Sequence, residues 1–173
     1  MSTVHTVEIV SQPVNLSESD AMKQVEGRFL DRIKSTVTDV EPVRATRRYK
    51  PFYSYDVTLT KRIFRGEDDV REGNLIVDAL TDIARPFTAD EIEEVSTEVP
   101  EDQVLEPEVP EEQARTTANG RRMQVEHREG GNLEILGEPQ LVYKPVWIVE
   151  LSNDEVRVVD AVDGTVFTDM LLG

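Results

Sequence analysis

The sequence predicts an α+β protein built from two tandem repeats, each a helix followed by an antiparallel sheet, with the sheets packed or joined with pseudo-two-fold symmetry. Two short sequence motifs that each occur twice, which we call words, predict this fold class. Tyr49-Lys50-Pro51 returns as Tyr143-Lys144-Pro145, and Val77-Asp78-Ala79 returns as Val159-Asp160-Ala161. Two words shared in the same order indicate a duplicated unit. Their offsets, 94 and 82 residues, place the 12-residue difference in the loop expected after Lys61, where insertions are tolerated.

The two repeats are joined by a segment of different composition. We expect the first repeat, with an extra N-terminal strand, to span residues 1–88 and the second to span residues 111–173. Residues 89–110 are expected to form an acidic, proline-containing linker. The stretch from residue 89 to residue 114 holds eleven acidic side chains, three prolines and no Lys or Arg. A short helix is possible within it, around Ala89–Val95.

The amino-terminal part predicts one strand and one helix. Thr3–Val10 alternates in the way that is typical of a strand. Ser17 is expected to cap the following helix, with Asp20 three residues later as the acid of a capping-box variant. From Glu18 to Ile33, apolar side chains recur at helical spacing and form one stripe, made of Ala21, Met22, Val25, Phe29 and Ile33.

The rest of the first repeat predicts paired strands. An extended stretch begins at Pro42, and Pro51 is expected to mark a break or bulge, because proline cannot donate a ladder hydrogen bond. Phe52–Thr60 is dense in aromatic and β-branched residues, which favours a strand. After a long polar connection that follows Lys61, Leu75–Leu80 is expected to be the returning strand.

The second repeat predicts the same order. A polar helix is expected from Glu111 to about Glu126, and its few apolar residues predict weaker packing than in the first helix. Three strands follow, at Leu133–Leu136, Gln140–Leu151 and Glu155–Ala161. A last short strand, Thr165–Thr168, is expected after an Asp-Gly turn.

Charge and composition narrow the class of protein. The chain has 35 acidic and 19 basic residues, a formal net charge of -16, only five lysines and no cysteine. An acid-rich, lysine-poor surface resembles that of haloarchaeal cytoplasmic proteins, where molar salt screens the repulsion, although an acidic mesophilic protein is the alternative. Without cysteine there are no disulfides or thiolate metal sites. Neither a membrane-spanning run nor a secretory signal is visible, so a cytoplasmic protein is expected.

One part of the second repeat resembles a known family. Trp147-Ile148-Val149-Glu150, followed by Val159-Asp160-Ala161-Val162-Asp163-Gly164, resembles the end of a PepSY-type domain. That family has an alanine-bearing helix, a strand with an aromatic-x-Val pattern and a strand that closes in a Val-Asp-Ala-x-x-Gly turn. Residues 111–164 follow this order, and residues 16–82 follow it more loosely, with Asp82 where the glycine would stand. The resemblance implies a duplicated PepSY-like fold and a non-catalytic module; some members inhibit or chaperone peptidases.

Few residues suggest catalysis. His5 and His127 are the only histidines, and neither accompanies a nucleophile motif or a second histidine at metal-binding spacing. Asp78 and Asp160 occupy equivalent positions and could form paired acids. Both directly precede turn-like segments, however, where a carboxylate commonly accepts backbone N–H groups. We therefore expect surface histidines and structural aspartates, with no catalytic residue, metal or cofactor.

Basic and aromatic residues interleave in the first repeat. Residues 41–66 hold seven basic and two acidic side chains, a local net charge of +5 in a chain of -16. Such strands can bind single-stranded nucleic acid, although pairing of the arginines with the acidic residues 89–112 is the simpler interpretation. The doubled Tyr-Lys-Pro words suggest strand edges that could receive a partner. The expected interaction surface consists of Arg44, Arg47, Arg48, Tyr49, Lys50, Tyr53, Tyr143, Lys144 and Trp147.

These observations predict a non-enzymatic, cytoplasmic protein–protein interaction module, or an adaptor subunit, of a halophilic archaeon. Its partner would be another protein or a second copy of the chain, and no membrane contact is expected. The alternative is a nucleic-acid-associated protein that uses the basic and aromatic strands of residues 44–65.

Overall fold

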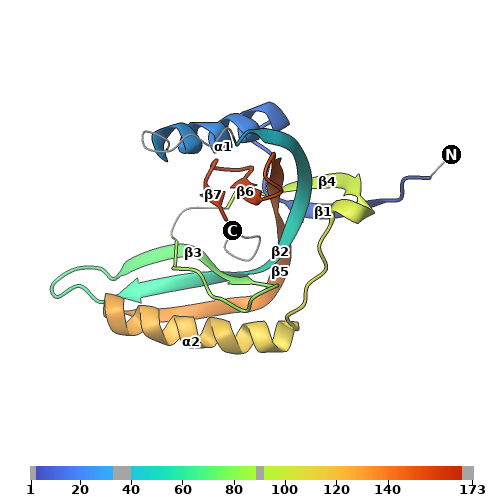
Figure 1. The fold of residues 1–173 in the computed structure, drawn as a ribbon. Coiled ribbons are helices and arrows are strands. Elements are labelled where there is room, and N and C mark those ends of the chain that lie inside the picture. Colours follow the sequence, from blue (N-terminus) through green and yellow to red (C-terminus); the bar gives the residue numbers. More distant parts are fainter. Residues whose placement is uncertain (1–2, 33–39, 89–91, 169–173) are drawn as a thin grey trace. The chain divides into compact units, whose positions relative to one another are not determined.

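The computed structural model describes residues 3–32, 40–88 and 92–168 (Figure 1). Within these residues, two α-helices and a seven-stranded sheet confirm the predicted α+β class. The elements are β1 (Thr6–Ser11), α1 (Glu18–Arg32), β2 (Pro42–Lys61), β3 (Asp69–Asp78), β4 (Val95–Pro100), the 3₁₀ helix η1 (Glu101–Gln103), α2 (Glu111–Glu129), β5 (Asn132–Leu151), β6 (Val156–Asp160) and β7 (Val166–Phe167).

The sheet has the strand order β3-β2-β5-β1-β4, with β6 paired to β5 and β7 paired to β6. β1 pairs antiparallel with β4, β2 with β3, β5 with β6, and β6 with β7. β1 meets β5 in parallel at Ser11 and Tyr143, where the amide of Gln12 donates to the Tyr143 carbonyl at 2.9 Å. Pairing between distant parts of the chain therefore builds much of the sheet.

The chain forms two compact units. Unit 1 consists of Met1–Lys50, Glu94–Leu105 and Tyr143–Gly173, and unit 2 consists of Pro51–Glu93 and Glu106–Val142. Unit 1 contains α1 together with β6, whereas unit 2 contains α2 together with β3. Each unit thus combines the helix of one expected repeat with the last strands of the other. The long strands β2 and β5 each contribute one half to each unit, and they pass between units at or beside the Tyr-Lys-Pro words.

Unit 1 buries two residues of the apolar stripe of α1. Ala21 and Val25 lie in one cluster with Val149 of β5, and burial of a valine side chain contributes about 1.5–3 kcal/mol. The predicted cap is present: the amide of Asp20 donates to Ser17 Oγ and the amide of Ser17 donates to the Asp20 carboxylate, both at 3.2 Å. The Ser17 hydroxyl also donates to the Asp20 carboxylate at 2.9 Å, and the two hydrogen bonds that this carboxylate accepts from Ser17 lower the pKa of Asp20. The capping box and the stripe together fix the start of α1.

Unit 2 packs α2 along its part of the sheet (Figure 1). The helix buries only Ala114, Ala118 and Val125, and the two alanines let its backbone approach the strands closely. Gly130, with a φ of 68°, ends the helix in the left-handed conformation, and its amide donates to the Glu126 carbonyl at 2.9 Å. The strands supply the larger core side chains Tyr55, Val57, Leu59, Leu75, Val77 and Leu133.

Both helices lie where the sequence predicted them, and α2 ends three residues later than expected. The predicted end of α1 at Ile33 lies outside the described residues. The expected break at Pro51 was wrong, because β2 is one strand from Pro42 to Lys61 and the Pro51 carbonyl accepts the Ala79 amide at 3.1 Å. Proline removes only a donor, and its acceptor still takes part in the ladder.

Two further expectations about strands differ from the structure. β5 joins two expected strands into one, since Gly137, with a φ of 65°, turns the chain locally without ending the strand. The acidic stretch expected as a linker contains β4 and η1, because residues 95–100 pair antiparallel with β1 and bury the Val99 side chain. Of the possible short helix, residues 89–91 lie outside the described residues and residues 92–94 are not helical.

Candidate interaction site

The predicted interaction surface is divided between the interior and the surface. A buried side chain cannot meet a partner while the fold is intact, so the buried members of this set serve the interior instead. Those members are Tyr49, Lys50, Tyr143 and Trp147 in unit 1 and Tyr53 in unit 2. Among the remaining members, Arg44 is exposed, whereas Arg47, Arg48 and Lys144 are half-buried.

Arg47 is held by two of the buried aromatic rings. Its guanidinium carbon lies 5.7 Å from the ring centre of Tyr49 and 5.6 Å from that of Trp147, which are cation–π distances. The buried Nε of Arg47 has no hydrogen-bond partner among the described residues. Burial raises the pKa of Tyr49, and the Arg47 charge opposes that shift. Part of the basic and aromatic pattern therefore stabilises unit 1 internally.

The other two arginines of the predicted surface have local partners. Arg44 forms an exposed ion pair of 2.8 Å with Glu150, and Arg48 donates to the Arg47 carbonyl at 2.9 Å. The partner of Arg44 thus lies on β5, not in the acidic residues 89–112. Exposed pairs of this kind contribute little to stability, so Arg44 remains available to a stronger partner.

Asp160 closes the turn after β6 and is almost fully buried. Its Oδ1 accepts the amides of Val162 at 2.8 Å and Asp163 at 3.3 Å. Its Oδ2 contacts Lys144 Nζ as an ion pair. The carboxylate is therefore engaged on both oxygens, as expected of a structural residue.

Asp78 closes the turn after β3 in the same way. Its Oδ1 accepts the amides of Leu80 at 2.8 Å and Thr81 at 3.1 Å. Its own amide donates to the Ile83 carbonyl at 3.0 Å, as the amide of Asp160 does to Thr165 at 2.8 Å. The fourth residue after each aspartate has a positive φ, which is 59° at Asp82 and 80° at Gly164. The repeated aspartates thus make matching local hydrogen bonds.

The repeated alanines and aromatic residues anchor the segments that precede the helices. The Ala79 carbonyl accepts the amides of Glu108 and Val109, both at 2.9 Å, and the Tyr53 hydroxyl donates to the Val109 carbonyl at 2.7 Å. These contacts hold the chain directly before α2. The burial of Tyr53, expected to be exposed, follows from this contact.

Unit 1 contains the equivalent arrangement before α1. The Ala161 carbonyl accepts the amides of Asn15 at 2.9 Å and Leu16 at 3.0 Å, and Trp147 Nε1 donates to the Leu16 carbonyl at 2.8 Å. Tyr53 and Trp147 both stand four residues after the tyrosine that begins a Tyr-Lys-Pro word. The repeated motifs, which were expected to form an interaction surface, therefore hold the segment that precedes each helix.

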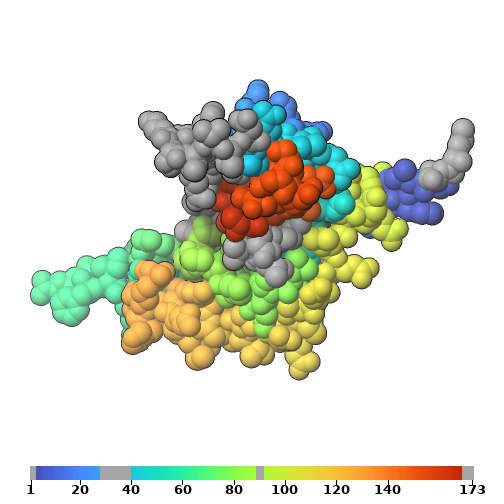
Figure 2. Space-filling model, viewed as in Figure 1, coloured from blue at the N-terminus to red at the C-terminus, as the bar shows by residue number. Residues whose placement is uncertain are grey.

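The hairpin tip, which we define as residues 62–68 between β2 and β3, was not predicted as a site from the sequence. All seven residues are exposed, and the segment projects from the rest of unit 2 (teal in Figure 2). The Phe64 side chain is 92% exposed and that of Ile63 is 54% exposed. The guanidinium carbon of Arg65 lies 5.8 Å from the Phe64 ring centre. Two large apolar residues within a polar connection were the signal that could have identified this site.

The base of the hairpin is tied to the end of α2. Lys61 Nζ lies 2.6 Å from Glu129 Oε2, and the hydrogen bond from Lys61 lowers the pKa of Glu129. A Cβ on Gly131 would lie 2.7 Å from the Thr60 carbonyl oxygen, so the chain after α2 passes too close to β2 for a larger residue. The tip therefore extends from an anchored base.

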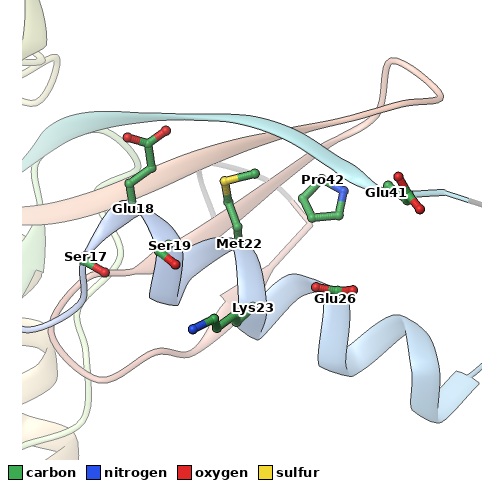
Figure 3. A pocket seen from close by; sticks show the side chains of 8 residues that line it. All are labelled: Ser17, Glu18, Ser19, Met22, Lys23, Glu26, Glu41 and Pro42. Carbon is green, nitrogen blue, oxygen red and sulfur yellow. The ribbon is translucent and has the colours of Figure 1, made fainter.

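A groove lies between α1 and the start of β2 in unit 1 (Figure 3). Its volume is about 650 Å³, and Met22 and Pro42 form its apolar part. Glu26 and Glu41 lie at one end and Glu18 at the other (Figure 3). With Lys23 the only cation beside three glutamates, the described lining of the groove has a net negative charge.

The two histidines of the sequence both lie within the described residues. His5 and His127 are both exposed. Within the described residues, no group of three or more His, Asp or Glu side chains could share a metal ion. Neither described helix has the length and apolar character needed to span a membrane.

Comparisons with known proteins add no further constraint on the site. No family model, curated protein or solved structure matches this chain significantly. The functional argument therefore rests on the geometry of its two units.

Proposed function

We propose that this chain is a non-enzymatic protein–protein interaction module whose binding element is the hairpin tip. The exposure of Phe64 beside Ile63 carries this proposal. Burial of one such side chain by a partner contributes about 1.5–3 kcal/mol, which makes an apolar residue at a projecting turn an effective anchor. Arg62 and Arg65 flank the apolar pair, and Glu67 and Asp68 follow it, which adds a charge pattern for specificity.

We further propose that the module acts as an adaptor subunit in the cytoplasm of a halophilic archaeon. The excess of acidic over basic residues, 35 against 19, and the low lysine content support this setting. At about 1 M salt the Debye length is about 3 Å, so contacts between exposed charges weaken while apolar burial persists. An anchor based on Phe64 suits such a solvent.

The architecture that we propose is a duplicated PepSY-like unit whose two copies exchange their helices. The matching hydrogen bonds of Asp78 and Asp160, and those of Tyr53 and Trp147, support the duplication. The division of the chain supports the exchange, since each unit combines a helix from one repeat with closing strands from the other. In this proposal the shared parts maintain the fold, and the hairpin tip, which only the first copy has, carries the binding.

Nucleic-acid binding is the second candidate, and the tip is the observation that favours it. An exposed aromatic ring between two arginines can stack on a base while the cations contact phosphates. The burial of Tyr49, Phe52, Tyr53 and Tyr55 argues against a larger stacking platform on the neighbouring strands.

Affinity purification from the native organism tests the leading proposal. The baits are the wild type, Phe64→Ser and the control Ile83→Ser, which changes a 60% exposed apolar residue of the same unit outside the tip. We expect a partner that co-purifies with the wild type and the control and falls about tenfold or more with Phe64→Ser. Equal recovery with all three baits would contradict the proposal.

Filter binding with single-stranded RNA or DNA tests the second candidate. Binding at low salt that is lost in an Arg62→Glu/Arg65→Glu variant would favour nucleic acid. Absence of binding by the wild type at low salt would remove that candidate.

A further inference from the structure

A second feature of unit 2 lies apart from the hairpin tip. One face of α2 and residues 86–87 enclose a small pocket, lined by Pro86, Phe87, Arg121, Gln124, Val125 and Arg128. Arg121, Gln124 and Arg128 are spaced three and four residues apart, so they lie along one side of the helix. Among the described residues, the lining of this pocket contains two cations and no acid, whereas that of the groove in unit 1 contains three glutamates and one lysine. The positive charge of this lining is opposite in sign to the net charge of the chain.

The apolar wall of the pocket is fixed by the backbone beneath it. Residues 84–88 run beside β3, with bridges from Ala84 to Val77 and from Thr88 to Asn74. A Cβ on Gly73 would lie 2.2 Å from the Thr88 carbonyl oxygen and 2.8 Å from a ring carbon of Phe87. Only a residue without a side chain lets this segment lie so close to β3. The position of the Phe87 ring therefore depends on Gly73.

Within the described part of the chain, each of the two arginines contacts one polar partner and has further N–H groups that a ligand could use. Arg121 Nη2 donates to the Ala84 carbonyl at 2.7 Å, which fixes the guanidinium and uses one of its five N–H groups. Arg128 Nε lies 3.5 Å from Glu129 Oε1, a weak pair, while Lys61 holds the other carboxylate oxygen at 2.6 Å. The helix dipole explains a cation in the last turn, such as Arg128, but it does not explain Arg121 two turns earlier.

We propose that this pocket binds a compact tetrahedral oxyanion, namely phosphate or the phosphoryl group of a small molecule. Two guanidinium forks match the geometry and the double charge of phosphate. The pocket volume of about 190 Å³ lies below the usual range of about 300–1,000 Å³ for drug-sized ligands. It corresponds to about six waters, at about 30 Å³ each, which is enough for one such group. The side-chain amide of Gln124 supplies a further donor.

Titration of the wild-type protein with inorganic phosphate, followed by NMR at constant ionic strength maintained with KCl, tests this site. We expect saturable shifts of the Arg121 and Arg128 side-chain Nε–H signals, with a Kd on the order of 1 mM. Arg128→Gln and Arg121→Gln should each weaken binding about tenfold. The matched control Arg122→Gln removes the same charge from the same helix, but Arg122 pairs with Glu126 outside the pocket, so its Kd should stay within about twofold.

The source of the phosphoryl group is distinguished by a second titration with phenyl phosphate. Tighter binding than inorganic phosphate would identify a phosphoryl group carried on an apolar moiety that contacts Phe87, and equal binding would identify free phosphate. Arg128→Gln keeps the Arg121 contact with Ala84, so it separates binding from stability if Arg121→Gln unfolds. The proposal is overturned if the wild type shows no saturable shift up to about 100 mM phosphate, or if Arg122→Gln weakens binding as much as Arg128→Gln.

Discussion

The β2–β3 and β5–β6 hairpins are equivalent at one end and different at the other. At the shared end, Phe52 pairs with Asp78 in the first hairpin and Val146 pairs with Asp160 in the second. At the other end, β5 and β6 are joined by a tight turn in which the Leu151 amide donates to the Glu155 carbonyl at 2.8 Å. The first hairpin continues for ten residue pairs, against five, and then forms the exposed tip.

This difference separates structural residues from candidate binding residues within one chain. The shared ends hold buried aspartates and aromatic donors whose hydrogen bonds attach the helices. The unshared end holds Ile63 and Phe64, whose side chains are 54% and 92% exposed. A substitution at a shared end should therefore change the free energy of unfolding, whereas one in the tip should change binding alone.

The largest effect is expected at the shared aspartates. Asp160→Ala removes the acceptor of two backbone amides and leaves Lys144 without its buried carboxylate, so the free energy of unfolding should fall by about 3 kcal/mol. Asp78→Ala should cost about 2–3 kcal/mol, because it removes the equivalent pair of amide contacts. Urea unfolding measures both values. A loss below about 1 kcal/mol in either variant would mean that the two ends are not structurally equivalent.

Two neighbouring tyrosines of β2 give a smaller and more specific comparison. Tyr53→Phe removes the hydrogen bond to the Val109 carbonyl and should cost about 1 kcal/mol. Tyr55 is buried, and its hydroxyl has no hydrogen-bond partner among the described residues, so Tyr55→Phe should be neutral or slightly stabilising. Equal losses in the two variants would show that ring packing, not the hydroxyl contact, distinguishes Tyr53.

The pH dependence of unfolding gives a further test of the buried hydroxyl of Tyr55. Burial raises the pKa of Tyr55 from 10.0 to about 12. Because the pKa is raised in the folded state, protonated Tyr55 contributes to the free energy of unfolding. This contribution is fully present below pH 10.0 and is lost as the pH rises through about 12. Tyr55→Phe should therefore lose less stability than the wild type over this range, as measured by urea midpoints at each pH.

A weaker pH effect is expected at the base of the longer hairpin. The hydrogen bond from Lys61 lowers the pKa of Glu129 below its usual value of 4.5. The contribution of the pair is therefore present above pH 4.5 and is lost as the pH falls through the lowered pKa. The difference in Tm between the wild type and Glu129→Gln should shrink on acidification and in high salt. A difference that is independent of pH would assign the effect to packing of the side chain.

The sequence predicted the fold class and the positions of both helices, because capping residues and apolar stripes are local signals. It did not predict that α1 shares a unit with β6 and α2 with β3, since that depends on which distant strands pair. The same limit explains why five residues of the expected interaction surface are buried. From the sequence alone, Tyr53 and Trp147 could be surface aromatic residues. The structure shows that they donate hydrogen bonds to the carbonyls of Val109 and Leu16. Ile63 and Phe64 are visible in the sequence as two large apolar residues in a polar connection, but only the structure shows that this connection is exposed.

The smallest effect on stability is expected from removal of the tip itself. Replacement of residues 62–68 by a tight turn such as the one that joins β5 to β6 makes the two hairpins alike at both ends. It removes no buried side chain and keeps Lys61 and Glu129, so the free energy of unfolding should change by no more than about 0.5 kcal/mol. Urea unfolding and partner recovery are measured on the same sample. Loss of the partner with unchanged stability would assign binding to the segment that the hairpins do not share, whereas a large loss of stability would show that the tip belongs to the fold.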